Sequence, residues 1–176
     1  MRIDIIAEMD LTQDDDGAIA DLLLQAFGPD FDGRSYYKQR HHLRIVARDD
    51  AGDIVGHIAL LIRDIRLADR LTPIIGVAEV ATRPDRRGEG IAGALLGEAL
   101  RQARRSLADF VMLFGDRPLY AAAGFTTAAN PLTYVRLDGA RSDDKIHRID
   151  DCLMVLPLRD ASWDPDAPVD LVGHIF

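Results

Sequence analysis

The sequence predicts a mixed α/β fold in which helices flank a mostly antiparallel central sheet. Three observations lead to this prediction. Short apolar runs of strand length alternate with amphipathic helical segments along the chain. Two of these runs are joined by the turn Asp50-Ala51-Gly52-Asp53, which is typical of a β-hairpin. The length of 176 residues fits a single domain, residues 1–176.

Charge and capping signals support the two longer helices. Three acids, Asp14 to Asp16, stand where a helix has its positive end, and Gly28 follows the last turn of that helix. The segment 90–106 presents apolar residues at helical spacing and ends in arginines. In chain order we expect a strand at 2–9, a helix at 14–28, two strands within 43–67, a strand at 74–83, a helix at 90–106, a strand at 110–115, a short helix at 117–125, and strands at 132–137 and 152–158. We expect a polar loop at 138–151, and a tail over the surface after residue 158.

Composition narrows the class of protein. The net charge is −8, with a pI near 5.0, whereas proteins that bind nucleic acids usually present a basic face. No apolar run approaches the ~20 residues that cross a bilayer, and the N-terminus lacks a signal-peptide core. His41, His42 and His57 show no metal-ligand spacing with cysteines or acids. We therefore expect a cytoplasmic protein with no metal, no nucleic-acid partner and no membrane partner.

The stretch "RRGEGIAGALL", residues 86–96, matches two different phosphate-binding patterns. Gly88, Gly90 and Gly93 spell G-x-G-x-x-G, the dinucleotide fingerprint, and Asp116 provides an acid after the next strand. Arg87, Gly90 and Ala92 spell R-x-x-G-x-A. The segment 83–87 separates Gly88 from its strand, and a helix and a hairpin precede the motif, both of which disfavour the dinucleotide fold. The second pattern needs only a strand, a loop of inward-pointing N–H groups and a helix N-terminus, which together bind a pyrophosphate.

At these residues the chain resembles the GNAT superfamily of acyl-CoA N-acyltransferases, whose signature is Q/R-x-x-G-x-G/A. The later segment "LYAAAGF", residues 119–125, is similar to a helix of the same superfamily. The resemblance implies a GNAT fold and acetyl-CoA as the acyl donor. It places the pantetheine arm along the end of the strand at 74–83 and the pyrophosphate on the loop. The implied cofactor-binding residues are Val80, Ala81, Thr82, Arg86, Arg87, Gly88, Glu89, Gly90, Ile91, Ala92 and Gly93.

Two residues are implied to be catalytic. Tyr120 aligns with the tyrosine of the superfamily that protonates the leaving thiolate, and a phenol suits this task because its pKa is ~10 against ~8.5 for a thiol. Glu79 is the candidate base that takes the proton of the attacking ammonium. In the aminoglycoside 2'-N-acetyltransferases the corresponding glutamate falls one place earlier, at Ala78. One residue reverses the face of a strand, which a β-bulge would restore. Otherwise another group, or water, is the base.

The acceptor is predicted to be a small amine, and a cationic one because several acids match acceptor contacts. The chain is similar to the aminoglycoside 2'-N-acetyltransferases and to the nodulation acyltransferases, and this similarity implies acceptor contacts at Asp30, Asp150, Asp151 and Phe176. The tail 160–176 would pack near that site, and a homodimer is expected from the family. The His174–Phe176 ending lacks an acid that those enzymes carry. The alternatives are a CoA-binding module without catalysis and a nucleotide-dependent oxidoreductase.

Overall fold

The computed structural model describes residues 1–138 and 141–176, and the chain divides into two compact units. The first unit comprises Met1–Leu61 and Val77–Arg101, and the second comprises Ile62–Gly76 and Gln102–Phe176. Across the described ranges, no helix is both long and apolar enough to cross a membrane.

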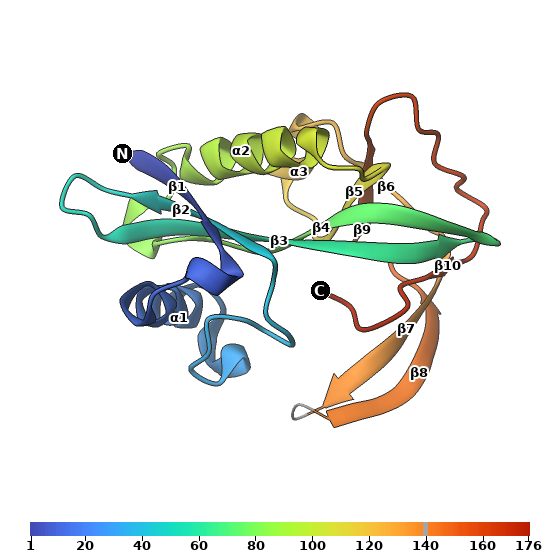
Figure 1. Cartoon of the computed structure of the whole chain (residues 1–176), viewed down its shortest axis with the longest axis horizontal. Helices are drawn as coiled ribbons and strands as arrows, with labels where there is room; N and C mark the ends of the chain where they lie inside the picture. The colour runs from blue at the N-terminus through green and yellow to red at the C-terminus, as the bar shows by residue number, and fades with distance from the viewer. Residues whose placement is uncertain (139–140) are drawn as a thin grey trace. The chain divides into compact units, whose positions relative to one another are not determined.

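The first unit is built on four antiparallel strands (Figure 1). The strand β1 pairs with β2, in the register Ile5↔Ile45, and β2 pairs with β3, in the register Ile45↔Ile58. The strand β4 lies next to β3, and both strands continue into the second unit. The bounds are β1 (Arg2–Ala7), β2 (Leu43–Arg48), β3 (Ile54–Leu67) and β4 (Arg70–Thr82).

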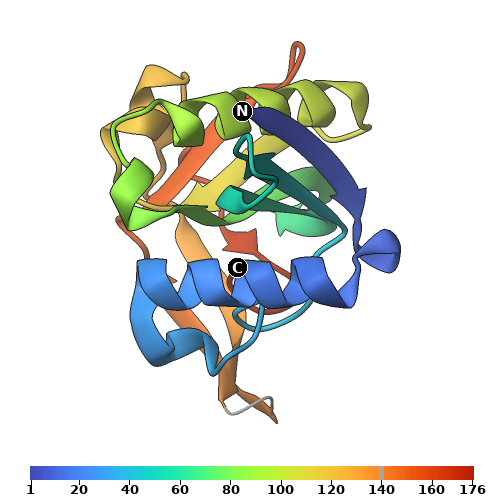
Figure 2. The same cartoon turned by 90° about the vertical axis from the view of Figure 1, so that its left-hand side faces the viewer.

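Two helices cover opposite faces of this sheet (Figure 2). The helix α1 (Gln13–Phe27) is capped by Thr12, whose side chain accepts a hydrogen bond from the Asp15 N–H, and its apolar stripe packs on Val46 and Ala81. On the other face, Ile91 and Leu95 of α2 (Ile91–Arg105) pack directly on Gly56. Three 3-10 turns accompany them, namely η1 (Glu8–Asp10), η2 (Gly28–Phe31) and η3 (Pro84–Arg86).

The second unit adds the remaining strands. The strand order of the sheet, with β3 and β4 included, is β6-β9-β5-β4-β3-β10-β7-β8. Neighbouring strands pair antiparallel at β5–β9, β6–β9, β7–β8 and β10–β3, whereas β10 and β7 are parallel. The predicted mixed α/β class with a mostly antiparallel sheet is confirmed. The bounds are β5 (Phe110–Phe114), α3 (Pro118–Ala122), β6 (Thr126–Thr127), β7 (Pro131–Asp138), β8 (Arg141–Ile149), β9 (Leu153–Pro157) and β10 (Val169–Asp170).

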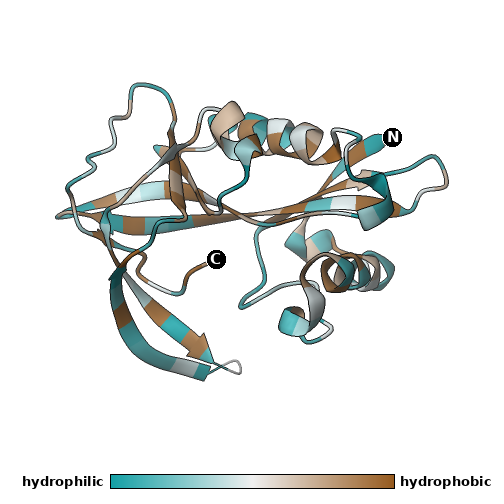
Figure 3. Ribbon diagram, turned by 180° about the vertical axis from the view of Figure 1, so that it is seen from behind, coloured by the Kyte–Doolittle hydropathy of each residue, from teal (hydrophilic) through white to brown (hydrophobic). Residues whose placement is uncertain are grey.

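Two expectations about the second unit are wrong. The segment 138–151 was expected to be a polar loop, but β7 continues to Asp138 and 141–149 form β8; residues 139–140 lie outside the described part. Almost every side chain of β8 is exposed, and its ribbon is mainly hydrophilic in Figure 3. Its sequence therefore lacks the apolar alternation that marks a half-buried strand. The tail does not simply cover the surface. Val169 and Leu171 are fully buried, and Trp163 packs edge-on against Phe110 at a centroid distance of 5.0 Å.

Candidate active site

The site begins at an irregularity in β4. Glu79 has φ = 55°, a left-handed conformation that is costly for a residue with a Cβ. Such a residue interrupts the strict alternation of a strand, as a β-bulge does. The Glu79 side chain is only 4% exposed, yet the residue as a whole is partly exposed, so its main chain provides the accessible surface. Strained residues of this kind are concentrated at functional sites.

The carboxylate of Glu79 is held by the loop that precedes β2 and by β2 itself. Its Oε1 accepts a hydrogen bond of 2.6 Å from the main-chain N–H of Tyr37. Its Oε2 accepts one of 3.2 Å from Nη1 of Arg44. The Nε2 atom of His41 lies 2.9 Å from Oε1 without forming a hydrogen bond. Both oxygens are therefore engaged inside the first unit.

Arg44 and His57 complete this buried cluster, and both side chains are fully buried. Arg44 forms a two-pronged ion pair with Glu8, at 2.6 and 3.1 Å, and donates to the main-chain oxygen of Ser35 at 2.7 Å. Burial, reinforced by the charge of Arg44, lowers the pKa of His57 to about 3. The neutral ring lies with Nδ1 3.0 Å from the main-chain oxygen of Glu79 and Nε2 3.3 Å from Nη1 of Arg44. Since the carbonyl oxygen can only accept and the guanidinium can only donate, the proton of His57 is on Nδ1.

The loop after β4 has the conformation that its glycines permit. Gly88 and Gly90 have φ of 86° and 77°, and a Cβ built on either would meet no protein atom within 4 Å. The helix α2 starts immediately afterwards, so its first N–H groups have no partners within the helix. Arg86 is joined to Glu89 by two hydrogen bonds of 2.6 and 2.8 Å. This loop has the features of an anion site on a helix N-terminus.

The end of β4 next to this loop carries an unsatisfied group. The Thr82 hydroxyl Oγ1 is buried and has no hydrogen-bond partner within residues 1–138 and 141–176. A buried hydroxyl without a partner costs about 1–3 kcal/mol. A ligand lying along the end of β4 would supply the missing partner.

Tyr120 lies in the second unit, on α3, and is 8% exposed. Its ring packs edge-on against Phe125 at 6.2 Å and closely against Gly115, where an added Cβ would come within 2.8 Å of Cε2 of Tyr120. Burial raises the pKa of the Tyr120 phenol above its usual value. The hydroxyl is therefore protonated throughout the neutral pH range.

The predicted acceptor residues have different surroundings. Asp30 is exposed on η2 in the first unit. In the second unit, Asp150 is buried and already engaged, because it accepts from Arg148 at 2.5 Å and from the main-chain N–H of Cys152 at 3.0 Å. Asp151 is exposed. Phe176 packs edge-on against Phe114 at 5.4 Å.

Comparison with known proteins bears directly on these features. A family model described as an acetyltransferase (GNAT) domain matches residues 10–128. An uncharacterized N-acetyltransferase, YhbS of Escherichia coli (strain K12), is 30% identical over 134 residues, which cover 74% of this chain and 79% of the relative. The chain belongs to the GNAT acetyltransferase family. It is therefore an acyltransferase. Of the two patterns in the loop, this membership favours R-x-x-G-x-A over the dinucleotide fingerprint.

Solved structures show the same GNAT fold. A GNAT family acetyltransferase from Brucella melitensis, in complex with acetyl-CoA, superposes with a TM-score of 0.62 at 24% identity, covering 96% of this chain and 94% of that one. YhbS from Escherichia coli, in complex with CoA, gives a TM-score of 0.67 at 24% identity, with coverages of 97% and 90%. These relatives do not confirm the finer similarity to the aminoglycoside and nodulation enzymes, which stays a prediction.

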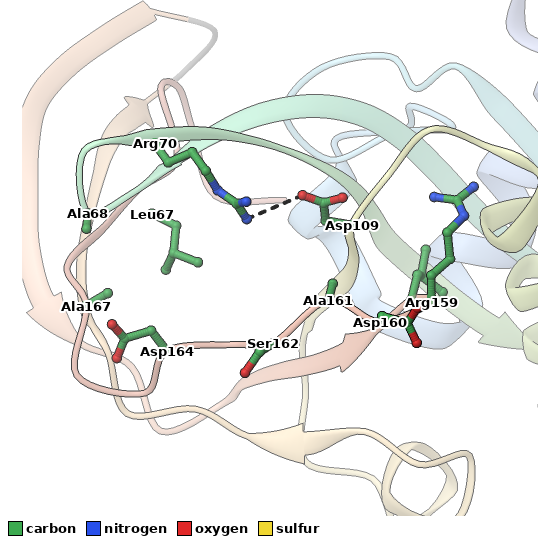
Figure 4. A pocket seen from close by; sticks show the side chains of 11 residues that line it. Leu67, Ala68, Arg70, Asp109, Arg159, Asp160, Ala161, Ser162, Asp164 and Ala167 are labelled. Carbon is green, nitrogen blue, oxygen red and sulfur yellow. Dashed lines mark hydrogen bonds and ion pairs between the residues drawn. The ribbon is translucent and has the colours of Figure 1, made fainter.

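The second unit of this GNAT protein also has a hollow of about 600 Å³ (Figure 4). The tail segment 158–164 forms one wall, and the turn between β3 and β4 forms another. Arg70 and Asp109 face each other across its rim at 3.4 Å. None of the predicted site residues lines this hollow. The predicted site residues therefore all lie outside this hollow.

Three members of the buried cluster were not predicted as site residues. Arg44 stands in an apolar strand, and His41 and His57 were considered only as metal ligands. The one signal in the sequence was the charged Arg44 inside the run "LRIVAR", residues 43–48. Its partner Glu79 is 35 residues away in the chain, and no local pattern links the two.

Proposed function

We propose that the chain transfers an acetyl group from acetyl-CoA directly to the primary amine of a small, cationic acceptor. The observation that carries this proposal is the loop with left-handed Gly88 and Gly90 at the start of α2, placed after an irregular strand end. Membership of the GNAT family and the CoA-bound relatives of the same fold support it.

The first unit provides the groups that would hold acetyl-CoA. The main-chain N–H groups between Arg87 and Gly93, together with the helix dipole, would bind the pyrophosphate. Arg87 is exposed beside them and adds positive charge. The free Thr82 hydroxyl and the main chain of Val80 and Ala81 would bind the pantetheine arm. One of these N–H groups would polarise the thioester carbonyl, as an oxyanion donor does.

The reaction requires two proton movements. An alkyl ammonium has a pKa of ~10 and must lose a proton before it can attack. Glu79 directly precedes the strand end that would align the thioester. The attacking ammonium would therefore lose its proton close to the Glu79 carboxylate. Tyr120 would protonate the departing thiolate, and its raised pKa keeps this proton in place before transfer.

Exposed acids would receive a cationic acceptor. Asp30 and Asp151 are exposed carboxylates, whereas Asp150 is already paired with Arg148. The net charge of −8 favours the approach of a cation. The proposed acceptor contacts therefore involve Asp30 and Asp151 rather than Asp150, with Phe176 as an apolar contact.

Calorimetry and thiol release test this proposal. Acetyl-CoA should bind with a clean isotherm and NAD should not, and acetyl-CoA with a panel of small amines should release CoA thiol. In Gly90→Ala the affinity for CoA should fall about tenfold or more, since a Cβ at φ = 77° strains the loop and occupies the space of the phosphate.

The matched control is Gly97→Ala within α2, where a Cβ also meets nothing within 4 Å and the affinity should be unchanged. Equal affinities of the two variants would contradict the role of the loop. Binding without any thiol release would make the chain a CoA-binding module.

A further inference from the structure

The strand β8 in the second unit has an edge that no other strand covers. It stands last in the strand order of the sheet, and within residues 1–138 and 141–176 it pairs only with β7. It is nine residues long, against about five or six for a typical strand, and its sequence "RSDDKIHRI" contains no proline. Such an edge is a template for pairing with another strand.

The main-chain hydrogen bonds of β7 determine which groups of β8 face this edge. The Thr133 carbonyl accepts a hydrogen bond of 2.9 Å and the Val135 N–H donates one of 2.8 Å, both with main-chain groups of the tail. Because these groups alternate along a strand, the N–H and carbonyl groups of Tyr134 point the other way, toward β8. Its partner there is Ile146, whose main-chain groups are therefore used by β7. The residues on either side of Ile146 present theirs at the uncovered edge.

A second copy of the chain fits this edge in an antiparallel register. Two copies related by a two-fold axis pair symmetrically, and paired side chains share a face of the sheet, so the axis must pass through one residue. Centred on Ile146, the pairing sets the two copies of Ile146 against each other and Asp144 of each copy against Arg148 of the other. Lys145 of each copy lies opposite His147 of the other, and their edge-facing main-chain groups form the hydrogen bonds.

Charge and length disfavour the neighbouring registers. An axis at Asp144 or at Lys145 sets two like charges directly opposite each other, which is destabilising. An axis at His147 leaves only residues 145–149 of the strand to pair, whereas residues 143–149 pair when the axis lies at 146. The register centred on position 146 is therefore the one that combines length with complementary charge.

Arg148 is already positioned for the contact with the second copy. Its guanidinium lies over the ring of Tyr134, 5.5 Å from the centroid, and binds Asp150 at 2.5 Å. A guanidinium has five N–H donors, so one that binds a single carboxylate keeps donors for a second. Asp144 is exposed and lies on the same face of β8 as Arg148, because alternate residues of a strand share a face.

We propose that two copies of the chain associate through β8, which pairs antiparallel with itself around a two-fold axis at Ile146. The sheet then continues from one subunit into the other. This inference concerns assembly and does not depend on the proposed acetyl transfer.

Sedimentation equilibrium of the full chain tests the association. The wild type should show a monomer–dimer equilibrium. In Asp144→Arg the dissociation constant should rise about tenfold or more, because two attractive cross-strand pairs become repulsive. The control Asp21→Arg makes the same change of charge at an exposed position of α1 and should leave the dissociation constant unchanged.

Cysteine crosslinking tests the register. The two copies of Ile146 would form a non-hydrogen-bonded pair, whose Cα atoms are about 4.5 Å apart, within the range of a disulfide. With the native Cys152 replaced by alanine, Ile146→Cys should therefore form a disulfide-linked dimer under mild oxidation. The control Lys145→Cys should form little, because the two copies of this position lie diagonal to each other.

The urea midpoint of each variant reports that it is folded. A wild type that stays monomeric at every concentration would overturn the proposal. So would a dimer in which Asp144→Arg or Ile146→Cys behaves like its control, because the association would then use another surface or another register.

Discussion

His57 provides a direct test of the buried cluster through the pH dependence of stability. The ring is fully buried, donates from Nδ1 to the main-chain oxygen of Glu79 and accepts from Arg44. Burial and the adjacent guanidinium lower its pKa to about 3 in the folded state. In the unfolded chain an imidazole has its ordinary pKa of about 6.5.

The sign and size of the effect follow from linkage. Between pH 6.5 and about 3 the unfolded state binds one more proton at His57 than the folded state does, so stability falls as the pH falls. At pH 5 the loss relative to pH 8 is about 2 kcal/mol, because each pH unit below the unfolded pKa contributes ~1.4 kcal/mol. The carboxyls of Glu8, Asp4 and Asp16 have lowered pKa values, so their losses begin at more acidic pH.

Urea unfolding at pH 8 and pH 5 measures this difference. The variant His57→Asn keeps an N–H near the position of Nδ1 but cannot titrate. It will be less stable at both values, yet its difference between them should be smaller than that of the wild type by about 2 kcal/mol. His147→Asn, which changes an exposed histidine on β8, serves as the control. Equal pH differences in the wild type and His57→Asn would refute the buried, neutral state of His57.

Two glycine substitutions test packing beside the proposed site. Gly56→Ala should lower the free energy of unfolding by about 1–3 kcal/mol, because the new Cβ would come within 2.5 Å of Ile91 and 2.9 Å of Leu95. Urea unfolding measures this loss. An unchanged midpoint would contradict the close packing of α2 on Gly56. Gly115→Ala places a Cβ 2.8 Å from the ring of Tyr120 and should move the phenol. We expect a lower kcat with nearly unchanged affinity for CoA in calorimetry, and a wild-type kcat would count against the proposed role of Tyr120.

The sequence predicts best those features that local chemistry determines. The start of α2 follows from the run 86–96, whose glycines and helical apolar spacing lie within a few residues of each other. The strand β8 was missed because its ribbon is exposed and is held by main-chain pairing with β7 rather than by an apolar face. The buried cluster was missed because it unites residues from η1, β2, β3 and β4, and nothing local in the sequence specifies that contact.

The cluster around Glu79 also fixes the direction of the main chain at the proposed thioester position. A left-handed residue in a strand costs about 1–3 kcal/mol unless the surroundings determine it. Here Tyr37 and Arg44 hold the side chain, and His57 holds the carbonyl oxygen of the same residue. Because a trans peptide is planar, the N–H of Val80 must point opposite to that carbonyl, away from His57. The buried imidazole thus orients an N–H group at the accessible end of β4. It connects a largely buried charge network to the carbonyl polarisation that the proposed reaction requires.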